Sequence, residues 1–166
     1  MTSFHKSMQK FRAGLEAGYL QEAYSGLMGY MRGLRLHFEK KFPNFSVPSK
    51  IYYGFMDMTY FAISTPVTKP HKLKFGVLFE YTNFQFEIYL SGFNRKVGAK
   101  YWRIIQEKNW TGYTLAEDPK KVDFIVYNVL AADPDFADLD ALTAKIEKGT
   151  LDFIDQSEGF LKSLSA

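Results

Sequence analysis

Several features that identify enzymes and exported proteins are missing from this sequence. It contains no cysteine, which excludes disulfides, thiolate zinc sites and cysteine nucleophiles. No apolar run approaches the roughly 20 residues that span a bilayer, and no apolar signal core follows the N-terminal residues. The nucleophile elbow, the phosphate-binding glycine loop and the dinucleotide fingerprint are also absent. We therefore expect a cytoplasmic protein with no membrane partner, and whether it is an enzyme stays open.

The composition is that of a globular protein. Hydrophobic residues make up 46% and charged residues 23% of the 166 residues, which is enough apolar material for an ordinary core. No repeat or long linker divides the chain, so we expect a single domain over residues 1–166.

Residues 1–110 carry 16 basic and 7 acidic side chains, whereas residues 111–166 carry 5 basic and 11 acidic side chains. We expect these two parts to pack against each other; a basic face left free for an anionic partner is the alternative.

Four segments have the apolar spacing of amphipathic helices. They cover about residues 4–16, 20–41, 95–108 and 139–164. Good N-cap residues stand before three of them: Ser3, Asn94 and Asp138. The second segment contains three glycines, each of which costs roughly 1 kcal/mol inside a helix. Gly26, Gly29 and Gly33 therefore predict that another backbone passes close to this helix.

Two segments, 72–81 and 84–90, alternate apolar and polar residues in a way that predicts a β-hairpin. A two-residue turn at Thr82-Asn83 places Phe79 opposite Phe86, and each inward residue then meets another inward residue. A slip of one residue would destroy this match. The pattern therefore predicts both the hairpin and its register.

Three further segments complete the expected sheet. Residues 52–61 read as a central strand and 113–116 as a short one, whereas 122–130 fits a helix or a strand, with its β-branched residues favouring the strand. The order α-α-β-β-β-α-(β)-α predicts an α+β fold. We expect an antiparallel sheet of about three to five strands flanked by helices.

Asp57 is the unusual residue of segment 52–61, because aromatic and apolar side chains surround it on both faces of the expected strand. A buried carboxylate costs several kcal/mol unless it is paired. Burial would raise the pKa of Asp57, so that it could act as a general acid or base. The alternative is a structural acid held by Arg32, by Arg35 or by backbone amides at a helix start.

Aromatic side chains without an inward assignment, together with polar side chains near strand and helix ends, predict a cleft. The candidate lining residues are Tyr53, Asp57, Tyr60, Glu87, Arg95 and Trp102. In this hypothesis the two acids accept hydrogen bonds, Arg95 clamps an anion at a helix start, and the aromatic rings form the walls. The first hypothesis is a non-catalytic binding module for a small ligand or protein partner, without a cofactor. Self-association is also open.

The alternative is a metal-dependent hydrolase. Glu80, Gln85 and Glu87 share one face of the hairpin, in an order of elements similar to that of restriction-endonuclease-like nucleases, which hold magnesium with such acids. Tyr89 stands where the lysine of a Glu-x-Lys motif is wanted, and the three histidines lack ligand spacing. We therefore expect no metal. Basic residues are scattered and most aromatic residues alternate inward, so we do not expect nucleic acid as a partner.

Four segments resemble an uncharacterised family of bacterial proteins, a domain of unknown function. They are residues 26–35, 53–61, 86–95 and 138–143. The resemblance spans most of the chain and carries no known activity, substrate or cofactor. It implies a free-standing bacterial cytoplasmic protein and transfers no functional residue.

Overall fold

All four expected helices are present in the computed structural model, which describes residues 3–165. They are α1 (Phe4–Glu16), α2 (Tyr19–Lys41), α3 (Arg95–Glu107) and α4 (Leu139–Ser163). The side chains of Ser3, Asn94 and Asp138 accept hydrogen bonds from backbone amides in the first turns of α1, α3 and α4. The three predicted N-caps are therefore confirmed, because each satisfies an amide that the helix itself leaves unpaired.

Six strands in the described residues form one antiparallel sheet, in the order β1-β2-β3-β4-β6-β5. They are β1 (Ile51–Tyr52), β2 (Met58–Ile63), β3 (Leu73–Glu80), β4 (Gln85–Gly92), β5 (Thr114–Leu115) and β6 (Val126–Ala131). A short 3-10 helix, η1 (Lys69–His71), precedes β3. The α+β class is confirmed, and β6 decides the ambiguous segment in favour of a strand. The sheet has more strands than expected because segment 52–61 divides into two.

The hairpin of β3 and β4 has the predicted register. Phe79 pairs with Phe86, and the last pair before the turn is Glu80 with Gln85. The connection is therefore a four-residue loop rather than the expected two-residue turn. The Glu80 carboxylate stabilises it by accepting hydrogen bonds from the amides of Thr82 and Asn83, at 2.9 and 2.6 Å.

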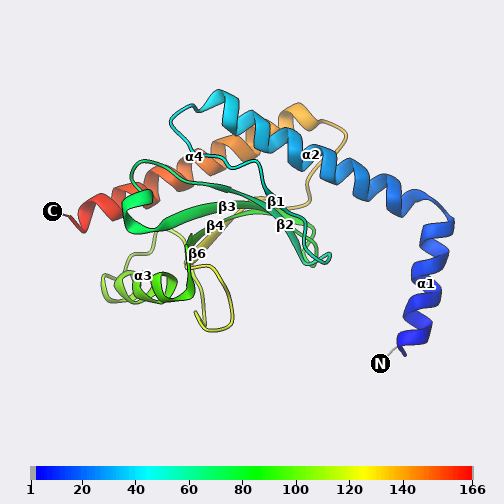
Figure 1. Ribbon diagram of the computed structural model, residues 1–166, viewed down its shortest axis with the longest axis horizontal. Helices are drawn as coiled ribbons and strands as arrows, with labels where there is room; N and C mark the ends of the chain where they lie inside the picture. The colour runs from blue at the N-terminus through cyan, green and yellow to red at the C-terminus, as the bar shows by residue number, and fades with distance from the viewer. Residues whose placement is uncertain (1–2, 166) are drawn as a thin grey trace.

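The hydrophobic core lies between one face of the sheet and the two long helices. Figure 1 shows α2 and α4 together over this face, while α3 lies on the opposite side of the sheet. Phe61 on β2 packs against Phe38 on α2, with ring centroids 6.0 Å apart, and Phe75 on β3 meets Phe153 on α4 at the same centroid distance. All four side chains are fully buried. This face of the sheet is the scaffold, and the opposite face is the one left accessible.

Charge contacts join the basic and acidic parts of the chain, as expected. Glu147 on α4 bonds His37 and Lys41 on α2, with a Lys41 Nζ–carboxylate distance of 2.7 Å. Burial by itself raises the pKa of Glu147, but the hydrogen bonds and charges of Lys41 and His37 lower it overall. These contacts hold α2 beside α4 over the sheet.

The three glycines of α2 do not mark a close approach, and that prediction is wrong. A methyl group added at Gly26 or Gly33 would meet nothing within 4 Å, and one at Gly29 would meet only the Arg32 side chain at 3.9 Å. The three positions lie on the exposed side of α2. Their helix cost is therefore not offset by packing against the residues that the structure describes.

Candidate ligand-binding cleft

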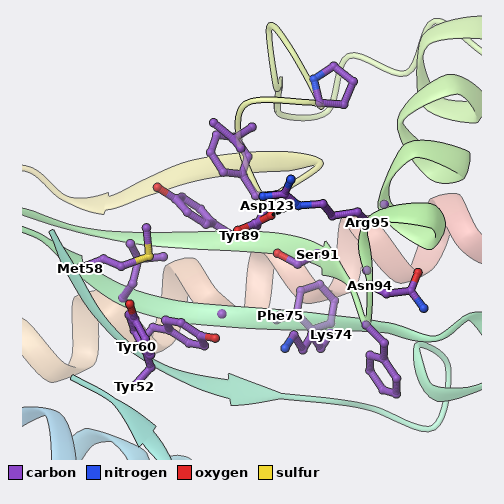
Figure 2. Close-up of a pocket in the computed structure, with 18 of the residues that line it drawn as sticks. Tyr52, Met58, Tyr60, Lys74, Phe75, Tyr89, Ser91, Asn94, Arg95 and Asp123 are labelled. Carbon is purple, nitrogen blue, oxygen red and sulfur yellow. Dashed lines mark hydrogen bonds and ion pairs between the residues drawn. The ribbon is translucent and has the colours of Figure 1, made fainter. Parts of the chain in front are cut away.

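The accessible face of the sheet contains a cleft of about 550 Å³. Strands β2, β3 and β4 form its floor, the start of α3 and the segment 119–124 form one side, and β1 lies at the other (Figure 2). A volume of this size lies within the range of small-molecule sites, roughly 300–1,000 Å³. The cleft is therefore large enough for a metabolite-sized ligand.

The strand alternation of β3 and β4 places a lysine and a serine on the cleft floor. Lys74 follows the core residue Leu73 and pairs across the ladder with Ser91, while Gly76 pairs with Tyr89. Lys74 is half-buried, and within residues 3–165 its ammonium group makes neither an ion pair nor a hydrogen bond. A half-buried cation that lacks an anionic partner among these residues is a candidate contact for an anionic ligand.

Two pairs of aromatic rings bound the floor. Tyr52 and Tyr60 lie together on the β1 side with ring centroids 5.2 Å apart. Tyr89 and Phe124 lie on the other side with centroids 4.3 Å apart. Between them is Gly76, where an added methyl group would stand 3.8 Å from the Tyr60 ring. The missing side chain at Gly76 keeps the floor open between the two aromatic pairs.

The start of α3 places Arg95 at the rim of the cleft. The Asn94 side chain caps the helix, and Gly92 at the end of β4 packs directly on Gly98. A methyl group at Gly92 would stand only 2.5 Å from the Gly98 backbone nitrogen, so the close approach of strand and helix requires glycine there. Arg95 donates to Asp123 across the rim at 3.1 Å, and both side chains are 79% exposed.

Tyr89 and Glu87 form a polar pair beside the floor. Burial raises the pKa of the Tyr89 hydroxyl, and its hydrogen bond to Glu87 and the negative charges of Glu87 and Glu80 raise it further. Gln85 donates to the Glu87 carboxylate at 2.6 Å. Glu87 is buried and does not line the cleft. Its negative charge favours the neutral form of the Tyr89 hydroxyl.

Asp57 is not a buried strand residue, and that prediction is wrong. It is exposed in the turn between β1 and β2, where Gly54 and Met56 have φ values of 74° and 62°. Its carboxylate accepts from the amide of Phe55 at 2.8 Å. Hydrogen bonds from the Phe55 and Met58 amides lower the pKa of Asp57, which is the opposite of the shift that burial would cause. Backbone amides hold this acid, but they belong to its own turn and not to a helix start as expected.

Neither arginine considered as a partner of Asp57 serves that role. Arg35 is buried and donates to the carbonyls of Val47 and Pro48, at 3.2 and 3.3 Å, and to Glu39 at 3.1 Å. It fastens α2 to the segment that leads into β1. The role of Arg35 is therefore structural, and its hydrogen-bond partners do not include Asp57.

Three of the six candidate residues line the cleft. Asp57, Tyr60 and Arg95 do so, whereas Tyr53 is exposed on the turn beside it. Trp102 instead donates to the carbonyl of Ala116 at 2.7 Å and holds α3 against the chain before β6. The residues that the sequence reasoning missed are Lys74, Ser91 and Phe124. The alternation of β3 and β4 places the first two on the face opposite the core, but the sequence reasoning did not assign them to the cleft.

Residues 4–161 match the family model described as a domain of unknown function, DUF7000, and the chain belongs to this family. The comparison with curated proteins and the comparison with solved structures gave no match. None of the described helices is long and apolar enough to cross a membrane. Within residues 3–165, no three histidine or acidic side chains are arranged to hold a metal ion.

Proposed function

We propose that this protein is a non-catalytic binding module that takes a small anionic ligand with an aromatic ring into the cleft. The observation that carries the proposal is Lys74, a half-buried cation without an anionic partner on the floor of a cavity of about 550 Å³. Ligand sites combine apolar walls with a few convergent polar groups. This cleft has that composition.

The anionic group of the ligand would lie over Lys74 and Ser91. The ammonium supplies up to three donors and the serine hydroxyl one more. Figure 2 shows Arg95 on the side of the cleft above these residues, where it bonds Asp123. A carboxylate or phosphate seated on Lys74 would attract the Arg95 guanidinium in competition with Asp123. Charge-assisted hydrogen bonds of this kind are roughly twice as strong as neutral ones.

The ring of the ligand would lie over Gly76, between the Tyr52–Tyr60 pair and the Tyr89–Phe124 pair. Aromatic pairs prefer offset-stacked or edge-to-face arrangements with centroids 4.5–7 Å apart. Rings on both sides of an unobstructed glycine support a flat apolar group at this position. The Tyr89 hydroxyl stays neutral beside Glu87, and the Tyr89 ring forms part of the wall.

The proposal is tested with four probes that separate charge from ring: benzoate, phenyl phosphate, inorganic phosphate and benzyl alcohol. We expect the two aromatic anions to raise the thermal midpoint most, because only they use both parts of the cleft. The Lys74→Met variant should lose this rise, and Lys145→Met, an exposed lysine on α4, should keep it. No rise with either aromatic anion, or an equal rise in both variants, would count against the proposal.

A second test adds an apolar side chain to the cleft floor and leaves every charged residue unchanged. Gly76→Val should abolish the response to phenyl phosphate, because its side chain would occupy the space between the aromatic pairs. Gly76→Ala is the matched control, since an added methyl stands at the ordinary contact distance of 3.8 Å from Tyr60. Full binding by Gly76→Val would place the ligand elsewhere.

The metal-dependent hydrolase remains the alternative, and no observation in residues 3–165 favours it over the binding module. A bacterial, cytoplasmic setting also belongs to the proposal and is supported by the sequence resemblance described above. Cell fractionation of a native host with an antibody to this chain would test that setting.

A further inference from the structure

Helix α1 has an apolar stripe that is exposed in the part of the chain that the structure describes. The stripe consists of Phe4, Met8 and Phe11, which are 80%, 45% and 42% exposed. Figure 1 shows α1 projecting away from the sheet and from the other helices. Isolated helices shorter than about 12–15 residues are marginal in water, and α1 has 13. The stripe therefore indicates a partner for α1.

A second exposed apolar patch lies at the β3–β4 loop and the start of α4. It consists of Phe84, Phe136 and Leu139, which are 55%, 37% and 44% exposed. The rings of Phe84 and Phe136 contact each other with centroids 6.1 Å apart, and Phe136 also meets the buried ring of Phe86. Four aspartates stand beside Phe136 and Leu139 in the chain: Asp133, Asp135, Asp138 and Asp140. We call the three apolar residues together with these four aspartates the acidic-rimmed patch.

The charges of the helix and of the patch are opposite, and within residues 3–165 the two lysines of the helix and the four aspartates form no ion pair. Lys6 and Lys10 on α1 make no ion pair within residues 3–165, and the only acid of α1, Glu16, is bonded to Arg12 at 2.7 Å. The four aspartates of the patch make no ion pair in the described chain either. A basic apolar helix and an acidic apolar patch are complementary in both charge and hydrophobicity.

The same chain cannot join these surfaces in the conformation described. The hydrogen bonds from Gly18 N–H to the Leu15 carbonyl and from Glu22 N–H to the Gly18 carbonyl, at 3.0 and 3.3 Å, continue through the corner between α1 and α2. A methyl group at Gly14 would stand 2.5 Å from Leu20, so the corner is also closely packed. The corner holds α1 away from the body of its own chain.

We propose that α1 docks on the acidic-rimmed patch of a second copy of this chain, and that the two copies exchange their α1 helices about a two-fold axis. Each chain carries both complementary surfaces, so one symmetric exchange covers all of them. The exchange forms the same contact twice, once on each side of the two-fold axis. The cleft takes no part in this contact.

Sedimentation equilibrium of the full chain tests the proposal by charge reversal. We expect the wild type to be a dimer, and both the helix variant Lys6→Glu/Lys10→Glu and the patch variant Asp133→Lys/Asp140→Lys to dissociate at least about tenfold more readily, because like charges then face each other. Mixing the two variants should restore a dimer, since each altered helix then meets a patch of opposite charge. The variant Lys69→Glu/Lys145→Glu changes the net charge equally elsewhere and should remain a dimer.

The apolar part has its own variant, Phe4→Ser/Phe11→Ser, which should be monomeric with an unchanged response of the cleft to phenyl phosphate. A wild type that stays monomeric at every accessible concentration would overturn the proposal, and so would a dimer that all three surface variants leave intact. Failure of the mixed charge variants to associate would overturn the helix-to-patch pairing.

Discussion

The two faces of the sheet differ in how their side chains are satisfied. On the helix-covered face, Phe61 and Phe75 are fully buried against α2 and α4. On the cleft face, the neighbouring residues Tyr60 and Lys74 are only half-buried, and the lysine has no ionic partner in the described chain. One strand thus supplies stability through one set of side chains and a candidate binding surface through the alternate set. The difference predicts which substitutions reduce stability and which reduce binding.

The largest expected effect compares two adjacent residues of β2. Phe61→Ala should reduce the free energy of unfolding by about 3–5 kcal/mol, because it leaves a cavity in the core. Tyr60→Ala, on the cleft face, should reduce it by about 1 kcal/mol and should weaken the response to phenyl phosphate. Urea unfolding of both variants measures the difference. Equal losses of stability would remove the distinction between the faces.

The next effect tests the ionic contact within the helix layer. Because the pKa of Glu147 is lowered in the folded protein, its contribution is present above the ordinary value of 4.5 and is lost as pH falls through the folded value. Glu147→Gln should therefore cost about 1–3 kcal/mol at neutral pH and much less in acid. Unfolding curves across this pH range measure it. If Glu147→Gln reduced the free energy of unfolding equally at neutral and at low pH, the result would contradict a charge contact of Glu147 with Lys41 and His37.

A smaller effect concerns the exposed glycines of α2. Gly26→Ala and Gly29→Ala should each stabilise the protein by about 0.5–1 kcal/mol, because alanine has the higher helix propensity and the added methyl has room. The control is Gly92→Ala, which should destabilise, since its methyl would collide with the start of α3. Thermal midpoints measure all three variants. Destabilisation by the α2 substitutions would show a packing role that is absent from this chain.

The smallest effect is at the edge of the cleft. Asp57→Asn should cost under about 1 kcal/mol, because the amide oxygen still accepts from the Phe55 amide and the side chain is exposed. What it loses is the charge, so any cost should disappear as pH falls through the lowered pKa of the carboxylate. Chemical denaturation at neutral and acid pH measures this. A loss of 3–5 kcal/mol would indicate the buried pair that the structure does not have.

The sequence predicted the helices and the hairpin because their signals are local. Apolar spacing and the caps Ser3, Asn94 and Asp138 determine where helices begin. The β3–β4 register follows from alternation alone. The turn at Gly54 was missed because aromatic residues on both sides imitate a buried strand. The available signal was a glycine followed three residues later by an aspartate, Gly54 and Asp57. The structure shows why glycine is needed there: a methyl at Gly54 would stand 2.1 Å from the Met58 carbonyl oxygen.

The candidate site was harder to predict because its parts come from distant segments. Tyr60 and Arg95 were identified from single residues, and both line the cleft. Lys74 became a candidate only when α3 and the segment 119–124 were seen to enclose the face on which it lies. Which polar residues of a strand face a cleft and which face open solvent depends on tertiary contacts that no local pattern contains.

The most direct test of the central claim is a map of where an aromatic anion binds. We would titrate the isotope-labelled protein with phenyl phosphate and follow its backbone amide resonances. The account predicts shifts at β2–β4 residues of the cleft floor and at the start of α3, and their loss in Lys74→Met. Shifts confined to the helix-covered side, or an identical map in Lys74→Met, would contradict it.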